Sequence, residues 1–201
     1  MINPIHLIAK GAVKLYARGE EKRYLKQVTE YGNNVYIKYP CTITKGGRDV
    51  LTIGDESTIL RDGRIQLYSY LVNRDVKCNI GKHCYIGRRF TILGGGDVTL
   101  EDNVLIADDV MIDSKNHGIN PAESTPYMDQ PLCDIRDVSI GEGTWIGTKV
   151  TILSGVTVGK KCVIGAGAVV TKDIPDYSIA LGVPARVVKR FNFELGKWEQ
   201  V

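Results

Sequence analysis

Residues 140–171 read IGEGTWIGTKVTILSGVTVGKKCVIGAGAVVT, and this stretch decides the fold. A helix cannot use its apolar period, because six residues at 3.6 per turn rotate a side chain by about 600° and scatter successive apolar residues over different faces. A solenoid can use it, since three six-residue units of strand and turn close one triangular coil and send every sixth side chain into a common shaft. Isoleucine or valine stands at every sixth position, namely Ile140, Ile146, Ile152, Val158, Ile164 and Val170.

The same period appears upstream of an interruption at residues 113–137. We therefore expect an all-β fold with coils over residues 35–175 and a long loop at 113–137. Residues four places past an apolar position are mostly compact, which suits crowded corners. The exceptions are Phe90, Asp102, Asp108 and Ile174. The expected shaft positions are Ile80, Ile86, Ile92, Val98, Val104 and Val110, after a weaker run at Ile53, Ile59, Ile65 and Leu71.

The two ends of the chain lack this period. Residues 1–34 form a basic leader whose apolar residues recur at helical spacing, which predicts a helix broken near Gly19. Its basic side chains fit either a solvated helix face or a weak contact with an anionic membrane surface. Residues 176–201 predict an amphipathic strand or helix that caps the last coil, as a solenoid end requires.

Composition bounds the class of protein. A chain of 201 residues is expected to be one domain, and a net charge of +3 without a nucleic-acid-binding motif does not favour DNA or RNA as partner. Five cysteines, three of them near the repeat register, predict buried thiols in a reducing compartment. With no signal-peptide core and no apolar run of about 18 residues, we expect a cytoplasmic protein, with contact at the inner face of the membrane left open.

The long loop is the natural place for function, because loops of more than about 12 to 15 residues in compact domains are usually functional or disordered. Of three histidines, His6 lies in the leader and His83 at a corner expected to face solvent. His117 stands at the root of the loop. Because imidazole titrates near pH 6.5, His117 is the candidate general base. A loop histidine that only bonds its own backbone is the alternative.

Several motifs resemble the hexapeptide-repeat acyltransferases. The resemblance covers about residues 50–190. It implies a left-handed parallel β-helix, a homotrimer with sites at subunit interfaces, and transfer of an acetyl group from acetyl-CoA to a hydroxyl or amine. Within the family the chain is most similar to sugar O-acetyltransferases of bacterial surface-polysaccharide (O-antigen type) pathways. The motifs are Asn116-His117-Gly118, Thr144 to Gly147, Gly165 to Gly167, Val170 to Pro175 and Gly182 to Arg186.

The resemblance also implies roles for residues. His117 would be the general base, and Asn116 would contact the acceptor or simply stabilise the turn. Trp145 would flank the pantetheine arm of acetyl-CoA or pack at a trimer interface. No metal is expected. The residues implied to bind the cofactor are Trp145, Thr148, Gly165, Ala166, Thr171, Lys172, Arg186 and Lys189.

One departure affects the acceptor. Relatives that act on small galactosides or maltose have an acidic and Asn-bearing pocket where this chain has Arg88, Arg89, Phe90 and then Gly94 to Gly96, which favours a larger or different saccharide.

Three alternative functions compete with a sugar O-acetyltransferase. An N-acetyltransferase of a nucleotide-linked amino sugar or of an antibiotic shares the spacing. A zinc enzyme of the γ-carbonic anhydrase type needs more histidines than the coil region offers. A non-catalytic scaffold would not need the loop.

Overall fold

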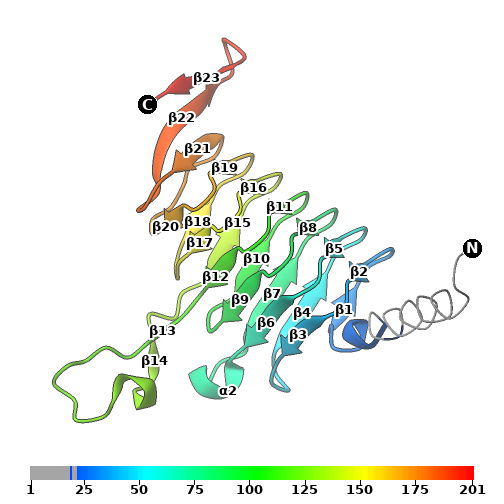
Figure 1. The fold of residues 1–201 in the computed structure, drawn as a ribbon, viewed down its shortest axis with the longest axis vertical. Coiled ribbons are helices and arrows are strands. Elements are labelled where there is room, and N and C mark those ends of the chain that lie inside the picture. The colour runs from blue at the N-terminus through cyan, green and yellow to red at the C-terminus, as the bar shows by residue number, and fades with distance from the viewer. Residues whose placement is uncertain (1–18, 20–21) are drawn as a thin grey trace, which may run out of the picture.

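The computed structural model describes residue 19 and residues 22–201 (Figure 1). Most of the predicted helical leader, His6 included, lies outside the described residues. Within them residue 19 and residues 22–25 are helical, so Gly19 itself is not the helix break that the sequence predicted. Figure 1 shows the remaining chain wound into stacked coils, from the first strands at one end to the C-terminal strands at the other. None of the helices among residues 19 and 22–201 is long and apolar enough to cross a bilayer.

Three parallel sheets form the faces of the coil, here called A, B and C, and the chain visits them in that order. Face A holds β1 (Glu30–Tyr31), β4 (Val50–Ile53), β7 (Lys77–Ile80), β10 (Val98–Leu100), β15 (Val138–Ile140) and β18 (Thr157–Val158). Face B holds β2 (Tyr36–Ile37), β5 (Thr58–Ile59), β8 (Tyr85–Ile86), β11 (Leu105–Ile106), β16 (Trp145–Ile146), β19 (Val163–Ile164) and β21 (Ser178–Leu181). Face C holds β3 (Cys41–Thr44), β6 (Gly63–Leu67), β9 (Thr91–Gly94), β12 (Met111–Asp113), β17 (Thr151–Ile152) and β20 (Val169–Val170).

Strand pairing explains the six-residue period. Ile140 pairs with Val158, Ile146 with Ile164, and Ile152 with Val170, each partner lying eighteen residues further along. One coil of three hexads therefore separates partners, and all six side chains are fully buried in the shaft. The predicted fold class, a left-handed parallel β-helix of hexapeptide repeats, is confirmed.

Upstream of the loop, the expected register was wrong by two residues. A strict six-residue period would pair Ile80 with Val98, eighteen residues further along. Ile80 pairs instead with Leu100, because the turn at Gly94 to Gly96 adds two residues to this coil. Val98 is buried all the same, since strands alternate and each face sends two side chains inward. Val104 and Val110 are buried for the same reason.

The exceptions to the compact-corner pattern now have causes. Phe90 is buried because Gly63 lies beneath it in the neighbouring coil, where a Cβ would overlap the Phe90 ring. Ile174 bridges to Val158 and so belongs to the shaft itself. The expected shaft position at Leu71 was wrong, because an inserted helix, α2 (Ser69–Val72), carries that side chain to the surface.

Asp102 and Asp108 turn out to be corner residues that join adjacent coils. Asp102 Oδ1 accepts a hydrogen bond from the backbone N–H of Lys82, and Asp108 Oδ1 from that of Arg88, both at 2.7 Å. Asp55 does the same for Asn33 N–H at 2.7 Å. A backbone donor at a tight corner has no strand partner, so these carboxylates supply one.

The corner carboxylates predict a loss of stability in acid. Hydrogen bonds from Arg88 lower the pKa of Asp108, and the Arg89 side chain lowers that of Asp109. A carboxyl whose folded pKa is depressed stabilises the fold above its unfolded value of about 3.9 and loses that contribution as pH falls through the folded pKa. We expect the melting temperature to fall as pH drops below about 4. Asp108→Asn should flatten this acid limb, and an unchanged limb in that variant would contradict the assignment.

Three cysteines behave as predicted. Cys78, Cys84 and Cys162 are buried, and all five cysteines are free thiols. Burial raises the pKa of Cys78 to about 12 and raises those of Cys84 and Cys162 above their ordinary value. Since the thiolate is the reactive form, these thiols are inert packing groups.

The C-terminal tail forms strands, one of the two predicted alternatives. After β21 the chain turns back into β22 (Arg186–Asn192), which pairs antiparallel with β21 and with β23 (Lys197–Gln200). Phe191 packs edge-on against Trp198, with ring centroids 5.3 Å apart. The tail thus extends face B beyond the last coil (Figure 1).

Candidate active site

The long loop is an arm that leaves the coil at one corner. Residues 113–137 run from the end of β12 on face C to the start of β15 on face A. Within this arm β13 (Asn116–His117) pairs antiparallel with β14 (Leu132–Cys133), and a short 3-10 turn, η1 (Tyr127–Asp129), lies between them. Figure 1 shows the arm projecting away from the stacked coils.

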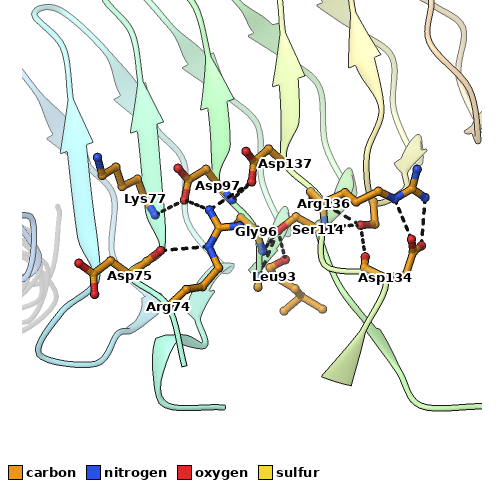
Figure 2. A network of polar contacts seen from close by, with 12 residues as sticks. Arg74, Asp75, Lys77, Leu93, Gly96, Asp97, Ser114, Asp134, Arg136 and Asp137 are labelled. Carbon is orange, nitrogen blue, oxygen red and sulfur yellow. Dashed lines mark hydrogen bonds and ion pairs between the residues drawn. The ribbon is translucent and has the colours of Figure 1, made fainter. Parts of the chain in front are cut away.

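Two buried serines hold the root of the arm. The Ser114 hydroxyl binds Gly96, which lies in the preceding coil. It accepts a hydrogen bond from the Gly96 N–H at 3.2 Å and donates one to the Gly96 carbonyl at 2.8 Å. The Ser154 hydroxyl, in the coil after, accepts from Arg136 N–H at 3.1 Å and donates to the Asp134 carbonyl. Figure 2 shows Ser114 beside Gly96, and Arg136 beside Asp134. The arm is therefore fixed at both ends by the coils on either side.

An ionic ladder ties the last arm residue to earlier coils. Asp137 Oδ1 accepts from Asp97 N–H at 2.8 Å, and Asp97 Oδ1 accepts from Lys77 N–H at 2.9 Å. The Arg74 guanidinium lies 3.3 Å from the Asp97 carboxylate and 3.4 Å from that of Asp137 (Figure 2). Three successive coils are joined at the corner from which the arm emerges.

Gln130 closes the arm upon itself. Its side chain is 4 % exposed. Its Nε2 donates to the carbonyls of Asn120 and Thr125, both at 3.0 Å, and its Oε1 accepts from Asn120 N–H at 3.0 Å. The sequence reading missed Gln130, because a glutamine among polar loop residues carries no signal of burial.

His117 lies at the root of the arm with an exposed side chain. Its backbone is engaged, since its carbonyl accepts from the Cys133 thiol at 2.9 Å. The next residue allows the two chains of the arm to approach: Gly118 N–H donates to the Pro131 carbonyl at 2.9 Å, and a Cβ there would sit 2.7 Å from the Gln130 Cβ. Asn116 is also exposed and pairs across the arm with Cys133.

A second group of predicted residues lies on face B and on the corner between faces B and C. Trp145 is in β16, 50 % exposed. Thr148 follows in the corner, where its hydroxyl donates to the Asp108 carbonyl and its own carbonyl accepts from Gly167 N–H, both at 2.8 Å. Gly165 and Ala166 form the equivalent corner one coil on, so the structure brings these four residues together.

A third group lies on the corner between faces C and A. A shallow hollow there includes Lys172, Asp173, Ala185 and Arg186. Thr171 is next to it in sequence and, like Lys172 and Arg186, is exposed. Lys189 is not part of this hollow, because it pairs with Ile179 at the end of face B.

One chain therefore does not unite all the predicted site residues. His117 belongs to an arm from the C–A corner, whereas Thr148 and Ala166 belong to the B–C corner. Lys172 shares the His117 corner but lies two coils further along. These two corners are the opposite borders of face C, so on a single chain a ligand that contacted both groups would have to cross that face.

Face B carries an exposed apolar column on its outer side. Tyr85 pairs with Leu105 and Leu105 with Trp145, so their side chains stand in one row. Tyr36 stands in the same row two strands earlier. These four side chains are 50 %, 44 %, 40 % and 50 % exposed in chain order. Thr58 separates Tyr36 from Tyr85 in this row, so the contiguous apolar part consists of Tyr85, Leu105 and Trp145, a candidate interaction surface.

Two further sequence expectations concern His83 and the paired arginines. His83 is exposed as expected, with Nε2 3.1 Å from Glu56 Oε2. Arg88 lies 2.7 Å from Asp108, and Arg89 Nε lies 2.6 Å from Asp109. Both arginines thus link corners of adjacent coils. Across residues 19 and 22–201, no group of three His, Cys, Asp or Glu side chains is placed to hold a metal ion.

Comparisons with known proteins agree with the sequence resemblance. Residues 137–172 match the family model "Bacterial transferase hexapeptide (six repeats)". Galactoside O-acetyltransferase of Escherichia coli K12 is 40 % identical over 114 residues, 57 % of this chain and 54 % of the relative. WbbJ of the same organism, named as an O-acetyl transferase of lipopolysaccharide biosynthesis, is 29 % identical over 187 residues, 80 % of this chain and 94 % of the relative.

A solved structure shares the fold as well. A galactoside acetyltransferase in complex with coenzyme A superposes with a TM-score of 0.57 at 29 % identity, covering 84 % of this chain and 68 % of that one. The chain spans about half the length of the Escherichia coli galactoside enzyme that it matches. The predicted resemblance to the hexapeptide-repeat acetyltransferases is confirmed, and the repeat that carries it is the stretch on which the fold depends.

Proposed function

We propose that the chain is an acetyl-CoA-dependent O-acetyltransferase that acts on a saccharide hydroxyl in surface-polysaccharide biosynthesis. The observation that carries the proposal is the exposed imidazole of His117 on an arm whose root is pinned by Ser114 and Ser154. Likeness to a galactoside O-acetyltransferase and to WbbJ supports a sugar hydroxyl as the acceptor. The cytoplasmic location predicted from the cysteines, and a membrane contact through the basic leader, remain part of this proposal.

The chemistry is a direct transfer. His117 removes the proton of the acceptor hydroxyl as its oxygen attacks the thioester carbon. The tetrahedral intermediate collapses, the C–S bond breaks, and the CoA sulfur leaves with the proton returned by His117. General base catalysis of this kind typically contributes 10² to 10⁴-fold in rate. Asn116, the exposed residue that precedes the histidine, would hydrogen-bond the acceptor.

The cofactor would lie along the coils. Thr148, Gly165 and Ala166 offer a corner with small side chains, which a pantetheine arm needs for close approach. Lys172 and Arg186 form a cationic hollow suited to the phosphates of CoA, because charged donors to phosphate make strong hydrogen bonds. Thr171 would line the path between them, and Lys189 would add a cation near the end of face B.

The active form would be a homotrimer, since the predicted site residues occupy two edges of one coil. The apolar column on face B supplies a surface for the contact, and Trp145 within it would serve both the interface and the cofactor path. The Leu105→Glu variant should therefore sediment as a monomer, and it should lose activity for the same reason. A Leu105→Glu protein that stays trimeric, or a fully active monomer, would contradict this assembly.

The proposal is tested by thiol release from acetyl-CoA across a panel of sugars and amino sugars. Release that requires a sugar hydroxyl is the expected result. Release only with amino sugars would move the assignment to an N-acetyltransferase. If no acceptor gives release, and CoA does not raise the melting temperature, the proposed activity is wrong.

A further inference from the structure

A polar surface on face C adjoins the root of the arm. Arg64 and Gln66 point outward from β6, since Ile65 between them faces the shaft. Gln66 pairs with Leu93 of β9, which pairs in turn with Asp113 of β12. Gln66, Leu93 and Asp113 therefore form one row across three coils, and this row ends where the arm begins.

Lys115 fixes a positive charge within this surface. Its side chain is only 11 % exposed, and its ammonium lies 3.5 Å from the Asp113 carboxylate and 5.6 Å from the centre of the Tyr68 ring. Gly95 makes room for it, because a Cβ there would sit 2.6 Å from the Lys115 Cβ. A buried ammonium needs partners, and the Asp113 carboxylate and the Tyr68 ring supply them, so this lysine is held in one orientation.

Tyr68 and Arg64 add further donors. Tyr68 is partly buried, which raises the pKa of its phenol despite the opposing charge of Arg64, so the hydroxyl is a donor at neutral pH. Arg64 is exposed and makes no ion pair within the described part of the chain. The negative charge of Asp113 balances the positive charge of Lys115. The positive charge of Arg64 is not balanced, so the surface has a net positive charge.

The position of this surface relates it to the catalytic base. Lys115 precedes His117 by two residues, so their Cα atoms are at most about 7 Å apart. That is the scale of one sugar ring. A ligand anchored at Lys115 would thus present a hydroxyl on the far side of the ring to the His117 imidazole.

We infer that the acceptor is an anionic saccharide, whose phosphate or carboxylate binds Lys115, Arg64 and the Tyr68 hydroxyl while its sugar hydroxyl reaches His117. The inference rests on the proposed function and specifies its substrate class. Phosphate and carboxylate share the chemistry that counts here, a compact anion that accepts charge-assisted hydrogen bonds from ammonium and guanidinium groups.

The test compares three acceptors that differ in charge: galactose, galactose 1-phosphate and galacturonate. Thiol release should be most efficient with one of the two anions, and which one is preferred identifies the anionic group. The first variant, Lys115→Met, removes the charge and keeps the aliphatic packing over Gly95. The second variant, Arg64→Met, changes an exposed residue, so it tests the same site even if Lys115→Met misfolds. Each should raise KM for the anionic acceptor roughly 10- to 100-fold, and by much more than it raises KM for galactose.

Lys77→Met is the matched control, because it removes the same charge from an exposed position on face A. Equal efficiency with galactose, or a loss in the variants that is the same for neutral and anionic acceptors, would overturn the inference. Equilibrium binding of galactose 1-phosphate separates the two claims. Binding weakened by Lys115→Met without any turnover would keep the surface and reject the proposed activity, whereas no binding would overturn the inference.

Discussion

His117→Ala should lose acetyl transfer by roughly 10² to 10⁴-fold or more while the protein melts at the wild-type temperature. The side chain is exposed, so its removal leaves no cavity. The backbone of the arm root stays held by the Cys133 thiol and by Gly118 N–H, neither of which depends on the imidazole. The measurement is thiol release at saturating acetyl-CoA, together with thermal unfolding of both proteins.

His83→Ala is the matched control, because His83 is the other exposed histidine of the coil region and lies on the corner between faces A and B. It should retain full activity. If His117→Ala kept more than about a tenth of the wild-type rate, another group would have to take the proton and the proposed mechanism would be wrong.

Ile152→Ala should cost about 2 to 5 kcal/mol of unfolding free energy. Its side chain is fully buried between Ile112 and Val170 in the shaft, which continues without interruption along face C. Close packing on both sides prevents the neighbours from collapsing into the space, so the variant loses both transfer energy and contacts. Denaturant unfolding at one fixed chain concentration measures the loss, because an oligomer's stability depends on concentration.

Thr151→Ala provides the comparison one residue away. Thr151 points outward on β17 and is partly exposed, so its truncation should change stability by about 0.5 kcal/mol or less. Similar losses at residues 151 and 152 would show that the shaft does not carry the stability of the fold.

The sequence supplied the candidate base as well as the shaft. His117 stood out because only three histidines occur and one of them begins a loop that a solenoid does not need. The residues that position it could not be predicted. Ser154 meets Asp134 twenty residues away, and Gln130 is recognisable only by the three backbone groups around it. Lys115 likewise looks like a surface lysine until Gly95 and Tyr68 are seen to enclose it.

The repeat specifies the coil without help from the rest of the chain, because three hexads close it locally and the residue at every sixth position, together with the one two places before it, is buried in the shaft. Where the period was unbroken, from Ile140 to Val170, every expected partner was correct. Only the tertiary structure decided what the insertions did. Two extra residues at Gly94 to Gly96 shifted Leu100 under Ile80, and the long arm placed His117 on a different edge from Thr148. The physical reason is that the residue facing a given residue in the next coil depends on the total number of residues in the intervening coil, insertions included. A local sequence pattern does not contain that number.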